Sequence, residues 1–175
     1  MGNHDSIDDF LERACKIFPF LDPEVEGTVD RICKLSKRFD TMLEHAVDAF
    51  GLNKGEFKLL LTLRQHNIDF TMSPGDIGEE LLLSSGAMTN RLDRLEAAGF
   101  VAREPDPDDR RALIVRLTKD GLRKIDEAVN AAAHDEIAVV SVLSPAEQKR
   151  LNALLRKLML SFEIKPRTMA AVGHA

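Results

Sequence analysis

The chain has 175 residues and a mass of 19.5 kDa, a length typical of one domain with a short appended segment. With 44% hydrophobic and 30% charged residues it can bury a sizeable core, which excludes a disordered polymer. Its formal net charge of −5 argues, taken as a sum, against a nucleic-acid partner, so the distribution of the charges decides that question.

The cysteine count and the polar start of the chain indicate a cellular compartment. Two cysteines, Cys15 and Cys33, are too few for a disulfide framework and fit a reducing environment. The amino-terminal segment lacks an apolar core, and no run approaches the ~18 apolar residues that a membrane helix needs. We therefore expect a cytoplasmic protein with no membrane partner.

The lack of Trp and Tyr argues against a protein that stacks single-stranded bases on such rings.

Apolar residues at spacings of three and four predict two amphipathic helices at the start of the chain. The first ends near Pro19, and residues 1–22 form an N-terminal helical extension. The second runs from about 24 to 50 and is ended by Gly51. Residues 23–50, together with the last two helices of the chain, are assigned to a helical dimerisation region.

Three shorter helices and two strands are expected next. The helices cover residues 54–66, 74–82 and 85–98, and each begins after a capping side chain. Their expected N-caps are Asn53, Ser73 and either Ser84 or Ser85. Apolar runs at 100–103 and 113–117 then predict two strands of a hairpin with a long, charged tip.

Two helices close the chain. Thr118 caps a helix of about twenty residues, and a capping box formed by Ser144 and Glu147 opens the last one. The apolar stripe of this last helix is expected to face inward and consists of Leu151, Leu154, Leu155 and Leu158. Residues 119–165 join the dimerisation region, and 166–175 form a flexible tail.

The order of these elements predicts the fold class. It is mainly α with a small β-hairpin wing, a winged helix-turn-helix over 51–118 flanked by N- and C-terminal dimerisation helices. The helix over 85–98 takes the place of a recognition helix, because it follows a short turn and directly precedes the hairpin. The flanking helices carry apolar stripes that so small a module cannot cover, so we expect a homodimer.

The expected recognition helix has one apolar face and one face of small and polar residues. Met88 and Leu95 lie on the buried face, and Gly86 and Asn90 lie opposite. Small groups in the first turns let a helix enter the major groove and bond to base edges or phosphates. For Ser84, a plain cap and a DNA contact are equally good interpretations. An outward Asn90 adds nothing to folding, which favours a DNA contact.

The hairpin tip carries Arg110 and Arg111 beside carboxylates such as Asp108. Arginines on a projecting hairpin suit the narrow and strongly negative minor groove, and neighbouring carboxylates can orient them. A charged loop on its own indicates only a solvated surface, but this one directly follows the expected recognition helix. Residues 84–124 hold nine basic and seven acidic side chains, so the excess negative charge lies outside the expected DNA-binding face.

Four segments carry a family resemblance in their order and spacing. They are LNKGEFKLLLTL (52–63), SSGAMTNRLDRLEAAGFV (84–101), DPDDRRALIVRLT (106–118) and LSPAEQKRLNALLRKL (143–158). Over roughly residues 25–162 the chain resembles the MarR family of bacterial transcriptional regulators. The resemblance implies a homodimeric winged-helix repressor that binds palindromic operators in double-stranded DNA. It also implies that a small-molecule effector weakens this binding.

The resemblance further implies particular DNA contacts on this chain. The family's recognition-helix contacts match Ser85, Gly86, Thr89, Asn90 and Arg94. Arg110 matches the wing arginine that enters the minor groove, and Asp108 matches the residue that orients it. Ser84 and Arg111, taken from the helix cap and the hairpin tip, complete the expected DNA-binding site.

The N-terminal helix and the GAMTNRLDRL segment are similar to a urate-responsive subgroup of the family. That subgroup binds its ligand with a Trp on the extra helix, an Asp on the helix expected over 54–66, and arginines on the recognition helix and wing. This chain has no Trp, and Lys58 stands at the position of the Asp, which argues against urate. A pocket of Lys58 and Arg91, with Arg111 or Arg116 of the wing, favours an anionic ligand such as a carboxylate.

Other functions are weighed against this one. Cys33 has the cations Arg31, Lys34 and Lys37 nearby, which would suit a redox-sensing regulator, but the tyrosines that accompany a sensor cysteine in that subgroup are absent. A winged helix that binds protein is the other alternative, and the arginines at the hairpin tip favour DNA instead.

Catalytic and metal chemistry have little support in the sequence. It contains no phosphate-binding glycine loop, nucleophile elbow or convincing nucleophile and base pair, so we expect no enzyme and no catalytic residue. The five histidines are scattered without a metal-ligand spacing, although His45 and Glu44 could join a site assembled in a dimer. We therefore expect no metal and no other cofactor.

Overall fold

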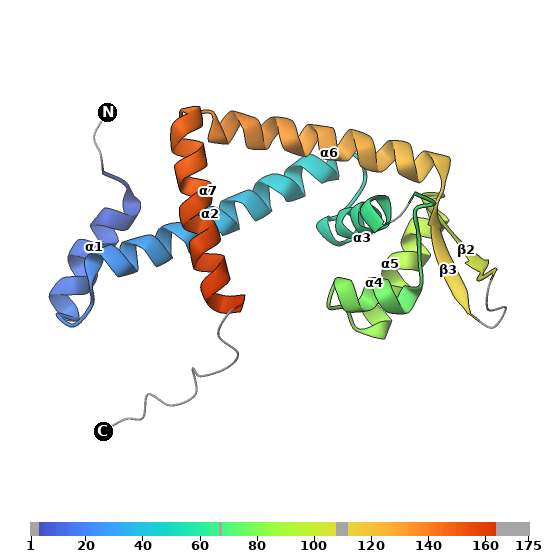
Figure 1. The fold of residues 1–175 in the computed structure, drawn as a ribbon, viewed down its shortest axis with the longest axis horizontal. Coiled ribbons are helices and arrows are strands. Elements are labelled where there is room, and N and C mark those ends of the chain that lie inside the picture. Colours follow the sequence, from blue (N-terminus) through green and yellow to red (C-terminus); the bar gives the residue numbers. More distant parts are fainter. Residues whose placement is uncertain (1–3, 67, 108–111, 164–175) are drawn as a thin grey trace, which may run out of the picture. The chain divides into compact units, whose positions relative to one another are not determined.

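The computed structural model describes residues 4–66, 68–107 and 112–163. The chain divides into two compact units, Met1–Ala133 and His134–Ala175, and each is described by itself. Seven helices and three short antiparallel strands follow one another over the described residues (Figure 1). The fold class expected from the sequence, mainly helical with a small sheet, is confirmed.

The first two helices begin at aspartate caps. The Asp5 side chain accepts the N–H groups of Ile7 and Asp8 at the start of α1 (Ser6–Ile17), and the Asp8 side chain accepts the Asp5 N–H in return. The long helix α2 (Pro23–Asp48) begins after Asp22, with its proline in the first turn, where a missing N–H costs nothing.

Helix α3 (Lys54–His66) is capped by Asn53 and has the bounds that the sequence predicts. A two-residue strand β1 (Thr71–Met72) follows it, where the sequence predicts only a polar connection. Two residues are too few to show the alternation that marks a strand, so the pairing with a distant segment decides this structure. Helix α4 (Pro74–Glu80) comes next.

Helix α5 (Ser85–Ala97) has Ser84 as its N-cap, which settles the choice between the two serines. Strands β2 (Val101–Pro105) and β3 (Leu113–Leu117) form an antiparallel hairpin, and β3 also pairs with β1, giving the sheet order β1-β3-β2. Helices α6 (Lys119–Val140) and α7 (Pro145–Glu163) close the described chain.

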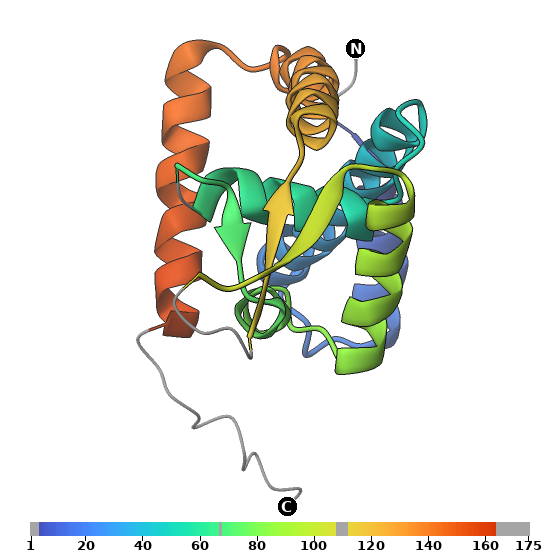
Figure 2. The same ribbon diagram turned by 90° about the vertical axis from the view of Figure 1, so that its right-hand side faces the viewer.

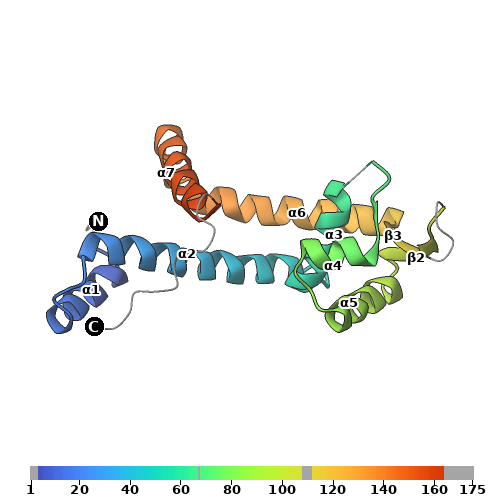
Figure 3. The ribbon, with the colours of Figure 1, turned by 60° about the horizontal axis from the view of Figure 1, so that its bottom comes forward.

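The core of the first unit lies where α3, α4 and α5 meet the sheet (Figure 2). The largest fully buried side chains are Val47, Leu59, Leu60, Leu63, Ile77, Leu95, Val115 and Ile125. At the other end of this unit α1 packs against α2 (Figure 3). Helix α5 and the β2–β3 hairpin are therefore built on one shared core.

The apolar stripe of α7 is exposed. The four leucines expected to face inward are 37–55% exposed, and α7 buries none of its residues. The expectation was wrong for the single chain, because the described residues of its own unit provide no layer that covers the stripe. No helix in the described part of the chain has the length and apolar character that a membrane crossing requires.

Candidate nucleic-acid interface

The first turns of α5 present a polar, open surface. Ser84 caps the helix, and its hydroxyl accepts the Ala87 N–H at 3.4 Å. The Thr89 hydroxyl donates to the Ser85 carbonyl at 3.0 Å. The residues of this surface that are exposed are Ser84, Ser85, Gly86, Thr89 and Asn90. The capping interpretation of Ser84 is thus confirmed, and the exposed side chain is accessible to a partner as well.

The opposite face of α5 anchors the helix in the core. Met88, Leu92 and Leu95 are buried, as their spacing in the sequence predicts. At Gly86, an added Cβ would meet no atom within 4 Å, so no contact within the chain requires a glycine there. The absence of a side chain keeps the backbone of the first turn accessible to a bound partner.

Arg94 is joined to the start of α3 by an ion pair. Its Nε lies 2.7 Å from Oε1 of Glu56, a buried residue, whereas the Arg94 side chain is 64% exposed. The other oxygen of Glu56 accepts the Asn53 N–H at 2.9 Å, and the Asn53 side chain accepts the Glu56 N–H at 2.9 Å. The sequence prediction missed Glu56, although its spacing from the cap residue is that of a capping box.

Arg103 on β2 neutralises two carboxylates of α5. Its guanidinium lies 2.7 Å from Asp93 and 2.9 Å from Glu96, and its backbone N–H donates to Glu96 at 3.1 Å. Carboxylates on a recognition helix would repel phosphates, so this pairing makes the surface of α5 more acceptable to DNA. The sequence predicts no such contact, because residues on a helix and on the next strand have no fixed spacing.

The wing lies on the same side as the start of α5. Figures 1 and 2 both show the α4–α5 turn, the beginning of α5 and the free end of the β2–β3 hairpin on the lower side of the first unit. The hairpin closes next to its tip, where the Asp106 N–H donates to the Ala112 carbonyl at 3.0 Å. The expected tip residues Asp108, Arg110 and Arg111 lie outside the described residues.

The residues expected to bind a ligand are only partly brought together. The Arg91 guanidinium lies against Gly55, where an added Cβ would be 2.6 Å from Cζ, and Lys58 is exposed one turn further along α3. Arg116 instead pairs with Glu104 at 3.1 Å and donates to the Asp69 carbonyl at 3.1 Å. The fourth expected residue, on the hairpin tip, lies outside the described residues.

A cavity of about 390 Å³ opens at the junction of α2 and α3. It adjoins Gly55, on which Arg91 rests, and Asn53 of the capping box. Its lining consists of Glu44, His45, Asp48, Leu52, Asn53, Lys54 and Gly55. Among the expected ligand residues that the structure describes, Lys58, Arg91 and Arg116 do not line this cavity.

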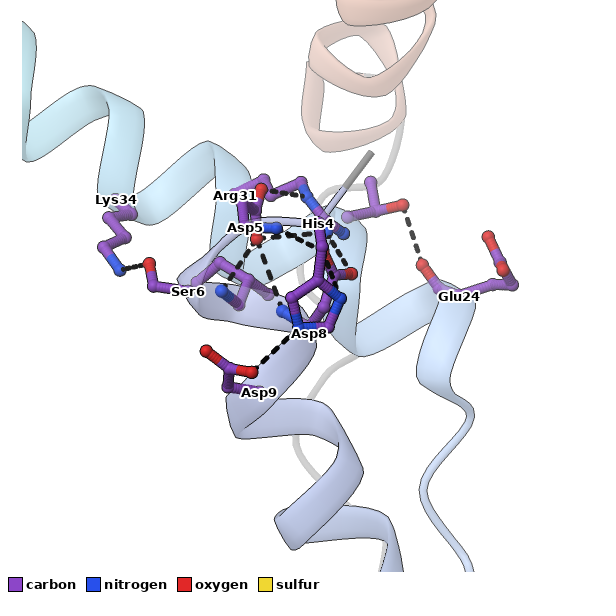
Figure 4. Close-up of polar contacts among 10 residues, drawn as sticks. His4, Asp5, Ser6, Asp8, Asp9, Glu24, Arg31 and Lys34 are labelled. Atoms are coloured by element: carbon purple, nitrogen blue, oxygen red, sulfur yellow. Dashed lines mark hydrogen bonds and ion pairs between the residues drawn. The ribbon is translucent and has the colours of Figure 1, made fainter. Parts of the chain in front are cut away.

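Charged side chains join α1 to α2 (Figure 4). The Arg31 guanidinium on α2 bonds to Asp5 at 3.0 Å and to Asp8 at 2.6 Å. Hydrogen bonds from Arg31 and from backbone N–H groups lower the pKa of Asp5 and Asp8, the largest cause being Arg31 for Asp5 and the Asp5 N–H for Asp8.

These contacts bear on the redox alternative. Of the cations near Cys33 in the sequence, Arg31 is held by carboxylates of α1 and Lys34 donates to the Ser6 hydroxyl. Cys33 itself is exposed and forms no disulfide with another described residue. The arrangement gives these cations structural partners and so offers no support for a sensor thiol.

Comparison with known proteins decides the family. The MarR family profile matches residues 52–113. The transcriptional regulator PecS of Dickeya dadantii (strain 3937) is 30% identical over 158 residues, which cover 90% of this chain and 95% of PecS. The chain belongs to the MarR family. This MarR-family protein is therefore a DNA-binding transcriptional regulator and not an enzyme.

Solved structures of the MarR family agree with this assignment. A point mutant of MarR from E. coli, complexed with operator DNA, is 26% identical with a TM-score of 0.63, covering 77% of this chain and 95% of that one. AbsC from Streptomyces coelicolor, at 20% identity, has a TM-score of 0.70 and covers 83% of this chain and 99% of its own. The likeness to AbsC concerns the fold alone.

Proposed function

We propose that this protein is a homodimeric repressor that binds a palindromic operator and is released by a small anionic ligand. The observation that carries the proposal is the exposed polar start of α5, on the same side as the free end of the hairpin. A helix end and a hairpin on one face can enter a major groove and the adjacent minor groove of one duplex.

The proposed DNA contacts divide into base-reading and positioning residues. Asn90 lies in mid-helix on the exposed face, and its side chain forms no hydrogen bond with the described part of the chain, so its carboxamide is free to bond to a base edge. Ser84, Ser85, Gly86 and Thr89 lie at the helix start, where hydroxyl and N–H groups suit phosphate oxygens. The remaining residues of the proposed DNA-binding site are Arg94, Asp108, Arg110 and Arg111.

The proposed dimer rests on two exposed apolar stripes. On α2, Val25, Val29, Ile32 and Leu35 are 39–56% exposed, and the leucine stripe of α7 is similarly uncovered. In a monomer both apolar stripes would stay in contact with water, without the favourable free energy of burying them. A second copy of the chain can cover them with the same kind of surface. Light scattering should give twice the 19.5 kDa of one chain at micromolar concentration. The mass of a single chain would contradict the dimer.

A two-fold dimer reads two half-sites on one face of the DNA. We expect tight binding when the half-sites lie about one helical turn, ~10 bp, apart. Inserting about 5 bp between them turns one half-site to the opposite face of the duplex. A mobility-shift titration should show a large loss of affinity for this probe, and equal affinity for both probes would contradict binding as a rigid dimer.

The proposed ligand is an anion held by Lys58 and Arg91. Arg91 lies on α5 and rests on the start of α3, so an anion between the two side chains would be in direct contact with the recognition helix. A panel of aromatic and aliphatic carboxylates, added to the protein–operator complex, should contain one that releases the DNA. Lys58→Asp should then abolish the response and leave DNA affinity unchanged. An unchanged response would remove Lys58 from the site.

A further inference from the structure

Leu82, in the turn between α4 and α5, combines two features that disfavour a leucine. Its φ is +52°, in the left-handed region that residues with a Cβ rarely adopt. Its side chain is 91% exposed, so packing within the chain gives nothing in return. The sequence predicts a helix that continues through Leu82, but α4 ends at Glu80, because this backbone conformation cannot continue a helix.

The hydrogen bonds around Leu82 define a helix-ending motif that normally contains glycine. The Leu83 N–H donates to the Gly78 carbonyl at 2.9 Å, and the Leu82 N–H donates to the Glu79 carbonyl at 3.3 Å. These two bonds form a Schellman motif, with Leu82 at the position where the chain turns left-handed. Glycine is preferred at this position because it has no Cβ.

The same chain uses glycine in this motif twice. Gly51 (φ +71°) ends α2 with the Leu52 N–H bonded to the Val47 carbonyl, and Gly99 (φ +73°) ends α5 in the same manner. The three motifs have the same bonding pattern and differ in the residue at the left-handed position. Folding alone would therefore favour glycine at position 82, so the leucine side chain needs another reason.

Dimerisation does not provide that reason. Most of the large exposed hydrophobic residues in the described chain lie on α1, α2, α6 and α7 or in the loops beside them. Within the winged helix-turn-helix the corresponding residues are Ile68, Leu82 and Leu113. Leu82 is the most exposed of these and lies two residues before the Ser84 cap of α5.

The position of the turn indicates what Leu82 meets. The α4–α5 turn lies on the same side of the unit as the start of α5 and the free end of the hairpin (Figures 1 and 2). The edge of the major groove offers an apolar side chain the C5-methyl group of thymine and the carbons of deoxyribose. A leucine at this edge would bury its side chain only when DNA is bound.

We propose that Leu82 is a DNA-contact residue that makes an apolar contact with a thymine methyl group or a deoxyribose at the edge of the half-site. The inference rests on the proposed function, because it needs α5 in the major groove. Leu82 thereby lowers the stability of the free protein and raises the affinity for DNA. The turn that positions the recognition helix becomes part of the interface.

The variant Leu82→Gly separates the effect of Leu82 on the stability of the free protein from its effect on DNA affinity. Glycine adopts a positive φ without strain, so the melting temperature followed by circular dichroism should rise. Operator affinity, measured by fluorescence anisotropy with labelled DNA, should fall about threefold to tenfold because the apolar contact is lost. Leu82→Met keeps an apolar side chain and should retain most of the affinity. A Leu82→Gly protein that binds the operator as tightly as wild type would overturn the proposal.

Ile68 supplies a matched control. It is 88% exposed, and it precedes β1, whose Thr71 pairs with Arg116 near the end of β3 that lies away from the hairpin tip. Ile68→Ala should therefore leave operator affinity unchanged, and a loss equal to that of Leu82→Gly would overturn the proposal. Wild-type protein that fails to distinguish the operator from scrambled DNA would instead contradict the proposed function itself.

A modified operator distinguishes the two apolar groups of DNA. Replacing thymine by deoxyuridine removes the C5-methyl group and leaves the sugar in place. If Leu82 contacts the methyl group, wild type loses affinity on this probe and Leu82→Gly loses no more. If Leu82 contacts deoxyribose, each protein binds the thymine and deoxyuridine probes with equal affinity. The difference in affinity between wild type and Leu82→Gly then persists on both probes. Either result supports a DNA contact.

Discussion

The Nε of Arg94, an exposed residue of α5, lies 2.7 Å from a carboxylate oxygen of Glu56, a buried residue of α3. Glu56 also accepts the Asn53 N–H, so one carboxylate joins the cap of α3 to the side of α5. Because the carboxylate holds the guanidinium through Nε, the Nη groups of Arg94 can face a phosphate. Glu56 is thus a positioning residue for Arg94, which we propose as a DNA contact.

We expect Glu56→Gln to weaken operator binding by roughly tenfold or less, about 1 kcal/mol. The amide oxygen can still accept the Asn53 N–H, but it no longer pairs with a charged guanidinium. Anisotropy titrations of wild type, Glu56→Gln, Arg94→Gln and the double variant form a cycle. The double variant should lose little more than Arg94→Gln alone, and fully additive losses would show that Glu56 does not act through Arg94.

Gly86→Ala should make the protein more stable and a weaker DNA binder. An added Cβ meets open space in the free chain, and alanine favours a helix over glycine by up to about 1 kcal/mol. In the complex the methyl group would stand between the first turn of α5 and the DNA. Thermal unfolding and operator titrations of the same preparation measure both effects. Unchanged affinity would place the DNA further from Gly86 than we propose.

Gly121→Ala tests the packing that supports the wing. An added Cβ at this buried position would lie 1.9 Å from the Phe100 carbonyl oxygen, and this backbone atom cannot move without shifting the start of β2. We expect the free energy of unfolding to fall by about 1–3 kcal/mol or more in urea denaturation. Gly75→Ala is the control, since its Cβ meets only the Ser73 hydroxyl at 3.6 Å. Equal stability of the two variants would contradict this close approach.

The stability of the contact between α1 and α2 should depend on pH in the acidic range. The pKa of Asp5 and of Asp8 is lowered from 3.8 in the folded protein, so their bonds to Arg31 stabilise the docking of α1 above that pH. This contribution is lost as the pH falls below 3.8 through the folded-state values. In an NMR titration of the carboxyl carbons, both midpoints should lie below 3.8, and Arg31→Gln should raise them.

Glu147 is the internal control for that titration. Hydrogen bonds from the Ser144 hydroxyl and N–H lower its pKa, and Arg31 takes no part. Its midpoint should stay the same in Arg31→Gln. Midpoints of Asp5 and Asp8 that also stay the same would show that Arg31 does not hold α1 in solution.

Local signals in the sequence account for most of the fold. The capping residues Asn53, Thr118 and Ser144 mark the starts of α3, α6 and α7, because side-chain caps act within one turn of the chain. Gly51 and Gly99 mark helix ends for the same local reason, through their positive φ.

Features without a clear local sequence signal were missed or wrong. Strand β1 exists through its register with β3, and Leu82 carries no local sign of its left-handed conformation. The contacts of Arg103 with α5 join different elements, so no sequence spacing reveals them. The leucines of α7 form an apolar face as predicted, but a hydrophobic pattern does not tell which chain covers it.

Operator binding by Asn90→Ala and Arg110→Ala over a range of salt concentrations tests the central claim most directly. We expect Asn90→Ala to lose about 1–3 kcal/mol on the operator and to relax the preference at one base pair, since a base contact carries sequence information. Arg110→Ala should weaken binding to operator and scrambled DNA alike and reduce the salt slope by about one. Wild-type affinity, specificity and salt dependence in both variants would contradict recognition of DNA by α5 and the wing.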